Sequence, residues 1–73
     1  MIKSADASIL ERFAKKWKYI ATDYNGYTYM YTHKPKLVPA DKPLFWHTTK
    51  GEHAYVGTFN SSNWDKTIIN RKG

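Results

Sequence analysis

The spacing of apolar side chains at the start of the chain predicts an amphipathic helix over residues 4–16. Ser4 or Asp6 can cap its first turn, because a short polar side chain there accepts a hydrogen bond from a free backbone amide. The apolar residues of this segment recur at helical intervals: Ile9, Leu10, Phe13, Ala14 and Trp17. A helix this short is unstable alone in water, so we expect its apolar stripe to pack on a sheet.

The pattern then changes to residues that favour strands. An Asn25-Gly26 pair separates two such runs, and five of the six tyrosines lie within residues 17–32. Asn-Gly is a strong hairpin signal, because both residues tolerate the positive φ that a tight turn requires. The sequence therefore predicts an antiparallel hairpin with one face rich in aromatic side chains.

Two registers are compatible with this turn. A two-residue loop places Ile20 opposite Tyr31. A three-residue loop with a bulge instead places Ile20 opposite Met30. The register decides which residues share a face, and the pattern alone leaves both registers open.

The middle of the chain predicts a connection and a second hairpin. Residues 34–43 contain three prolines and no periodicity, which is typical of a stiff, extended segment. The second hairpin is expected from strands at 44–49 and 53–59, joined by a turn at 50–52. Gly57 lies inside the later strand and indicates a bulge or a close approach of backbone.

Residues 64–69 fit either a short strand or a helical turn, and the β-branched residues at their end favour a strand. Residues 70–73 are expected to be a frayed tail. The expected fold class is therefore α+β, in a single domain covering residues 1–73. It consists of an N-terminal helix packed on an antiparallel sheet of four to five strands, made of two hairpins.

The composition limits how such a core can be stabilised. No cysteine is present to form a disulfide, so stability must come from packed side chains, which include three Trp, six Tyr and three Phe. A chain of 73 residues is near the lower size limit for a self-sufficient core. We therefore expect a marginally stable monomer, or a homodimer that completes its core between subunits.

The charge is strongly basic. Twelve Lys and Arg against six Asp and Glu give a net charge of +6, which can attract nucleic acid, an acidic protein surface or anionic lipid. The basic residues are scattered, so an ordinary solvated surface explains them equally well. No stretch approaches the roughly 20 apolar residues that a membrane span requires, and residues 2–14 lack the apolar segment of a signal peptide. We expect no membrane association and a cytoplasmic location.

No pattern of catalytic or metal-binding residues is found. The chain has no cysteine, no activated-serine motif and no glycine-rich phosphate loop. His33, His47 and His53 lack the spacing of metal ligands, although His47 and His53 flank the predicted second turn and could approach each other across it. The sequence predicts a protein that is not an enzyme and that uses no metal or cofactor.

The tyrosine-rich hairpin also admits a nucleic-acid interpretation, because aromatic side chains on a basic sheet can stack on bases. The candidate residues for this interpretation are Lys15, Lys16, Lys18, Tyr29 and Tyr31. The hairpin lacks the basic-Gly-aromatic pattern of RRM domains. The same tyrosines serve as cross-strand pairs that stabilise a small sheet, and this structural use is favoured over base stacking.

Several short motifs follow one another along the chain: Ile20-Ala21-Thr22-Asp23-Tyr24-Asn25-Gly26, Tyr29-x-Tyr31, Lys34-Pro35, Trp46, and Phe59 followed by Trp64-Asp65. In this order the chain resembles small, mostly uncharacterised accessory proteins encoded by bacteriophages and prophages. Such proteins often end in an acidic tail, whereas this chain ends in Asn70-Arg71-Lys72-Gly73. The resemblance implies a location in the host bacterial cytoplasm and no activity that can be transferred residue by residue.

We therefore expect a non-enzymatic phage accessory protein that binds and modulates a host macromolecule, first of all as an inhibitor of a host protein. The expected partner-binding residues are Tyr27, Tyr29, Tyr31 and Trp46 as anchors, with Lys34 and Lys36 at the rim. Two alternatives stay open: a small basic nucleic-acid-binding protein, and a phage structural or assembly component.

Overall fold

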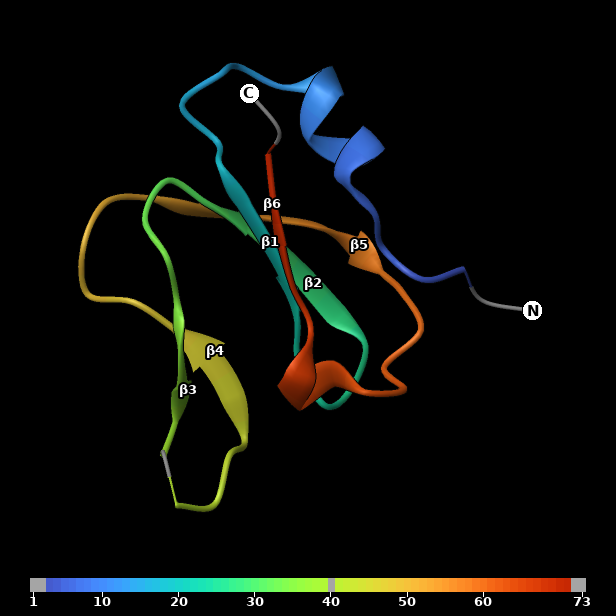
Figure 1. The fold of residues 1–73 in the computed structure, drawn as a ribbon, viewed down its shortest axis with the longest axis vertical. Coiled ribbons are helices and arrows are strands. Elements are labelled where there is room, and N and C mark those ends of the chain that lie inside the picture. The colour runs from blue at the N-terminus through green and yellow to red at the C-terminus, as the bar shows by residue number, and fades with distance from the viewer. Residues whose placement is uncertain (1–2, 40, 72–73) are drawn as a thin grey trace.

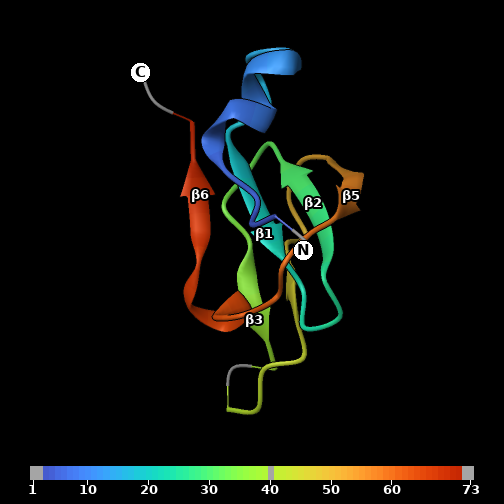
Figure 2. The same cartoon turned by 90° about the vertical axis from the view of Figure 1, so that its right-hand side faces the viewer.

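The computed structural model describes residues 3–39 and 41–71, which consist mostly of β-structure. Six strands are present there: β1 (Tyr19–Thr22), β2 (Tyr27–Tyr31), β3 (Lys36–Val38), β4 (Phe45–His47), β5 (His53–Thr58) and β6 (Ile68–Asn70). The larger antiparallel sheet has the order β5-β2-β1-β6, and β3 pairs with β4 in a separate antiparallel sheet. Figure 2 shows the four strands of the larger sheet following one another, and Figure 1 shows the β3–β4 pair to one side of them.

The predicted N-terminal helix over residues 4–16 is wrong, and with it the α+β class. Among the described residues the only helical segments are two short 3-10 helices, η1 (Ala7–Arg12) and η2 (Trp64–Lys66). Asp6 caps η1, as one of the two expected caps, by accepting a hydrogen bond from the Ser8 amide at 3.0 Å. The backbone becomes extended at Phe13, so no helix reaches residue 16.

A 3-10 helix and extended chain replace the predicted helix, because the carbonyl groups of this segment accept hydrogen bonds from a residue far along the sequence. The Arg71 side chain donates hydrogen bonds to the carbonyls of Leu10, Phe13, Ala14 and Trp17. In an α-helix the Leu10 carbonyl would accept from the amide four residues later. Here it accepts from the Phe13 amide, three residues later, and from Arg71. A tertiary contact has overridden the local helical pattern.

The first hairpin is present and adopts the three-residue register. Ile20 pairs with Met30, and the loop closes where the Asp23 amide donates to the Tyr27 carbonyl at 2.8 Å. Gly26 ends the turn with φ +89°, a conformation that glycine adopts without strain. This combination of a turn and a positive-φ residue is the usual way to close a three-residue loop.

One face of the larger sheet carries the apolar core. Leu10 of η1 is fully buried against Ile20 and Met30. Partly buried side chains surround this cluster: Ala5, Ile9, Trp17, Ala54, Val56 and Ile69. On the same face the hydroxyl groups of Thr22 and Thr28 bond to each other at 2.7 Å, which satisfies two buried polar groups. The N-terminal segment therefore covers this face, but as a 3-10 turn and extended chain.

The predicted second hairpin, strands at 44–49 and 53–59 with a turn at 50–52, is also wrong. β4 pairs with β3, and β3 lies within residues 34–43, the segment predicted to be a connection without a strand. β5 pairs with β2. The chain between β4 and β5 passes from one sheet to the other. Thr32 forms hydrogen bonds with Glu52, at the end of this segment next to β5. The Thr32 amide donates to the Glu52 carbonyl at 3.1 Å, and the Glu52 amide donates to Thr32 Oγ1 at 2.9 Å.

The bulge predicted at Gly57 is confirmed. Gly57 pairs with Thr28 while Tyr55 pairs with Tyr29, so Val56 is an extra residue in β5. Gly57 has φ +144°, which a residue with a side chain rarely adopts. Val56 packs on the core, as Ala54 does, while Tyr55 lies on the opposite face beside Tyr29.

The C-terminal segment contains both of the predicted alternatives in succession. Residues 64–66 form η2, and residues 68–70 form β6, which pairs with β1. The tail predicted from residue 70 therefore begins as a strand and continues into the well-bonded Arg71. Residues 72–73 lie outside the described part of the chain.

Candidate functional site

The small β3–β4 sheet is attached to the second face of the larger sheet through Trp46. The Trp46 amide donates to Asp23 Oδ1 at 2.9 Å, and its indole Nε1 donates to the Trp64 carbonyl at 2.9 Å. The Tyr31 hydroxyl donates to the Trp46 carbonyl at 3.4 Å. Three contacts from one residue thus fix β4 over the aromatic side of β1 and β2.

This attachment creates a small cleft between the two sheets, which we call the Asp23 cleft. Its volume is about 140 Å³, and its lining residues are Asp23, Tyr29, Tyr31, Trp46, His47 and His53. Burial raises the pKa of the Asp23 carboxyl above its ordinary value, and the hydrogen bond from the Trp46 amide partly offsets this. Burial, with Asp23 and Tyr29 nearby, raises the pKa of the Tyr31 hydroxyl well above its ordinary range. Tyr31 is therefore a neutral hydrogen-bond donor at neutral pH.

A row of aromatic rings runs from the cleft along β2 and β5; we call it the aromatic ladder (Tyr27, Tyr55, Tyr29 and His53). Successive ring centres are 5.8, 5.6 and 5.9 Å apart, and each pair meets edge to face. The geometry is favourable for aromatic pairs. Tyr27 and Tyr55 remain 49% and 54% exposed, so part of each ring is open to a ligand.

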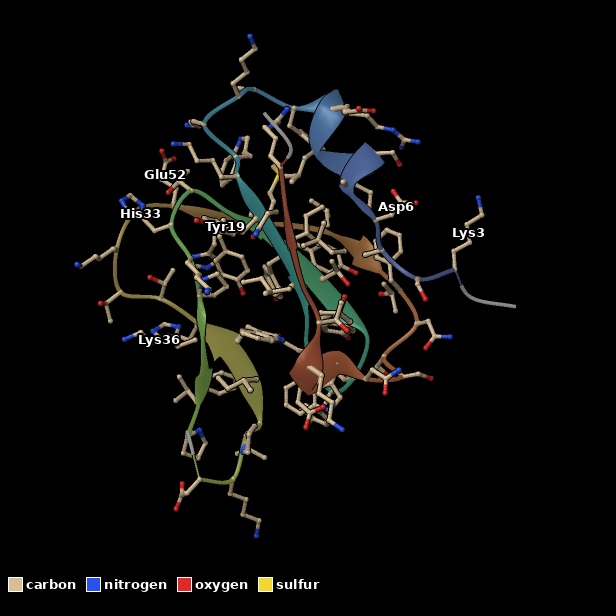
Figure 3. The ribbon with its side chains drawn as sticks, viewed as in Figure 1. Lys3, Asp6, Tyr19, His33, Lys36 and Glu52 are labelled. Atoms are coloured by element: carbon tan, nitrogen blue, oxygen red, sulfur yellow. The ribbon has the colours of Figure 1, made fainter. Side chains whose placement is uncertain are left out.

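A basic groove adjoins the cleft on the side of the small sheet. Its volume is about 380 Å³, and it is lined by His33, Lys34, Lys36, Val38, His47, Thr48, Thr49 and Lys50. Figure 3 shows His33 and Lys36 on this side of the molecule, with Glu52 above them. No carboxylate is among these lining residues, and the nearby Glu52 is paired with Lys16 at 3.0 Å. His47 lines both cavities, so the cleft and the groove adjoin each other at this residue.

His47 and His53, which could have approached each other across the predicted turn, instead line the Asp23 cleft from different sheets. His53 is the first residue of β5, and His47 is the last of β4. Within the described residues no three His, Asp or Glu side chains are arranged to hold a metal ion.

The structure places the predicted anchors in unequal positions. Tyr27 is exposed and Tyr29 is half-buried, both within the aromatic ladder. Tyr31 is only 3% exposed, and Trp46 is half-buried with its polar groups occupied. Tyr31 and Trp46 therefore shape the cleft rather than project from the surface.

The predicted basic residues fall into two groups. Lys34 and Lys36 line the basic groove. Lys15, Lys16 and Lys18 are exposed but do not line it, and Lys16 is engaged with Glu52 and lies 5.2 Å from the ring centre of Trp17.

Sequence reasoning did not select several residues of this surface, among them Asp23, His47, Lys50, His53 and Tyr55. The available signal was the alternation of His53 and Tyr55, which places both on one face of a strand. That signal becomes useful only when β5 is paired with β2, since the pairing puts these rings beside the tyrosines of the first hairpin.

Comparisons with known proteins found no match for this chain. No family model, no curated protein and no solved structure matches it. Among the helices of the described residues, none is long and apolar enough to cross a membrane.

Proposed function

We propose that this protein binds single-stranded nucleic acid without catalysing a reaction. The observation that carries the proposal is that two features adjoin the same cleft. A ladder of partly exposed aromatic rings ends in the Asp23 cleft, and this cleft shares His47 with a groove that has three lysines, two histidines and no lining carboxylate. A ligand that matches both must be a polyanion with flat, apolar groups along its length, which describes an unpaired nucleic-acid strand.

The exposed tyrosines favour an unpaired strand over a duplex. Stacking on a side chain requires a base whose flat face is free, and in a duplex that face is covered by its neighbours. Tyr27 and Tyr55 offer rings on a rigid sheet, and each stacked base contributes about 1–3 kcal/mol. Lys34, Lys36 and Lys50 would then contact phosphates.

A host-protein partner, the first expectation from the sequence, receives less support from the geometry. Protein hot spots need aromatic anchors that project into a partner, whereas the Tyr31 and Trp46 side chains are occupied within the fold. The phage origin, the inhibitory role and a homodimer stay predictions, and so does a role in phage assembly.

The test is the binding of fluorescent oligothymidine of about ten nucleotides, followed by anisotropy as salt is raised. We expect binding that weakens with salt, and weaker binding to a duplex of equal length. The triple variant Lys34→Ala, Lys36→Ala, Lys50→Ala should lower the steepness of the salt dependence by about 2, since each phosphate contact contributes about 0.7. The double variant Tyr27→Leu, Tyr55→Leu should weaken binding while leaving that steepness unchanged.

The matched control is Lys15→Ala, Lys18→Ala, which removes exposed lysines that do not line the groove. It should change the affinity much less per lysine removed. Equal loss per lysine in both variants would mean that only net charge attracts the strand. No binding at low salt would remove the nucleic-acid proposal and return attention to a protein partner.

A further inference from the structure

The Asp23 cleft contains a feature that phosphate binding does not explain. A carboxylate repels phosphate, yet Asp23 lines the cleft that separates the aromatic ladder from the basic groove. Its charge therefore opposes a bare polyanion and favours a ligand group with N–H donors.

The Asp23 carboxyl is also incompletely bonded. Oδ1 accepts the Trp46 amide at 2.9 Å, and no other donor from the described residues reaches the group. The carboxyl is half-buried, and burial raises its pKa. A partly desolvated carboxylate with a free oxygen gains more from a new donor than an exposed one does.

The rest of the cleft suits a flat ring. Its volume of about 140 Å³ is well below the roughly 300–1,000 Å³ of sites for drug-sized ligands. The walls are rings: Tyr29 and His53 lie 5.9 Å apart, and Tyr31 and His53 lie 6.1 Å apart with a tilt of 31°. Proteins read single-stranded nucleic acid by holding a splayed base against such rings and bonding its Watson–Crick edge.

We infer that the Asp23 cleft receives one base of the bound strand and selects guanine through the Asp23 carboxylate. This inference rests on the proposed function. Guanine presents two adjacent donors on its Watson–Crick edge, N1–H and the N2 amino group, and a carboxylate can accept both. Adenine, cytosine and thymine each place an acceptor beside their donor on that edge, which a carboxylate repels.

The test compares oligothymidine of about ten nucleotides with the same strand carrying one central substitution. We expect a single guanine to tighten binding to the wild-type protein about tenfold, the effect of one good bidentate contact. Adenine or cytosine at that position should give no comparable gain. Inosine, which lacks the N2 amino group, should retain only part of it.

The matched variant is Asp23→Asn. It keeps an oxygen for the Trp46 amide and replaces the other oxygen with an N–H donor, so the cleft keeps its shape. We expect this variant to lose the preference for guanine and to bind oligothymidine at least as tightly as the wild type, because it lacks the charge that opposes the strand. Trp fluorescence and amide NMR spectra establish that it is folded.

The outcomes separate the two ideas. No binding to any strand at low salt overturns the proposed function, and the guanine inference with it. Binding to all strands with equal affinity overturns the guanine inference alone. If Asp23→Asn fails to fold, the wild-type series still decides, because guanine and inosine share one ring system and differ only in the N2 amino group, and adenine is a purine of similar size with a different edge.

Discussion

At the scale of single residues, Arg71 connects the two ends of the described chain. Its guanidinium donates to four carbonyls of residues 10–17, which are 54 to 61 positions away in sequence. Its amide also donates to the Lys18 carbonyl at 2.7 Å. A planar cation with five donors spread over a rigid fork can serve several carbonyls at once, whereas a lysine has only three donors, all on one atom. This one side chain therefore does what the expected helix would have done for these carbonyls.

Arg71→Ala should lower the free energy of unfolding by about 2 kcal/mol, the range for hydrogen bonds that involve a charged group. Urea denaturation followed by tryptophan fluorescence measures the change. The control is Arg12→Ala, which removes an equal charge from an exposed position in the last turn of η1 and should cost less than about 0.5 kcal/mol. Similar losses in both variants would show that charge, not the carbonyl contacts, stabilises this region.

Gly26 makes a second prediction at this scale. A side chain there would place its Cβ 2.7 Å from the backbone carbonyl oxygen of Phe59, and φ is +89°. Gly26→Ala should therefore lower the free energy of unfolding by at least about 1 kcal/mol. Asn tolerates positive φ better than Ala but carries the same Cβ, so Gly26→Asn should lose a similar amount in the same urea experiment. A stable Gly26→Asn protein would mean that the close approach to Phe59 is not limiting.

At the scale of elements, the part of the fold that sequence could predict is the part with local signals. The Asn25-Gly26 hairpin and the Gly57 bulge depend on the conformations of a few neighbouring residues, and both are present. The helix predicted over 4–16 and the predicted pairing of 44–49 with 53–59 are both absent, because partners distant in sequence determine the structure of these segments. No local pattern indicates that Arg71 will donate hydrogen bonds to the carbonyls of the N-terminal segment, or that β5 will pair with β2.

The candidate site follows the same division. Lys34 and Lys36 of the basic groove and Tyr27 and Tyr29 of the ladder lie near the correctly predicted hairpin. Tyr55 joins them only through the pairing of β5 with β2. Its role could not be read from sequence, because strand partners are chosen by packing over the whole sheet.

The free energy of unfolding should depend on pH through Asp23, whose carboxyl accepts the hydrogen bond from the Trp46 amide of β4. Burial raises the pKa of this carboxyl in the folded protein above its ordinary 3.8. The native state therefore holds the proton more tightly, and the associated stability is present below pH 3.8 and is lost as the pH rises through the folded pKa. Asp23→Asn removes this dependence while keeping an acceptor for the Trp46 amide.

Urea denaturation of wild type and Asp23→Asn across the acidic range measures the effect as a difference between the two proteins. We expect the variant to gain stability relative to wild type as the pH rises from below 3.8 towards neutrality. A difference that is constant with pH, or that changes in the opposite direction, would show that Asp23 is better stabilised as an anion than its burial implies.

At the scale of the whole molecule, the protein is a flat body of 33 × 32 × 19 Å with packed layers on both sides of one sheet. One layer is the aliphatic cluster of Leu10, Ile20 and Met30. The other is the small sheet, attached through the three hydrogen bonds of Trp46. Regions with few buried apolar contacts open at lower free energy than the core does. We therefore expect β3 and β4 to open while the larger sheet stays intact.

Native-state hydrogen exchange of the backbone amides distinguishes this partial opening from global unfolding. The amides of Ile20 and Met30 should exchange only when the whole protein unfolds, whereas those of β3 and β4 should exchange at lower free energy.

Ile20→Val should lower the free energy of global unfolding by about 1 kcal/mol and leave exchange in β3 and β4 unchanged, because the core remains folded during the partial opening. Trp46→Phe removes the bond to the Trp64 carbonyl, which is broken in both openings, so it should speed exchange about fivefold in both regions. If Ile20→Val also speeds exchange in β3 and β4, the two sheets unfold as one unit, and the cleft between them opens only with the whole fold.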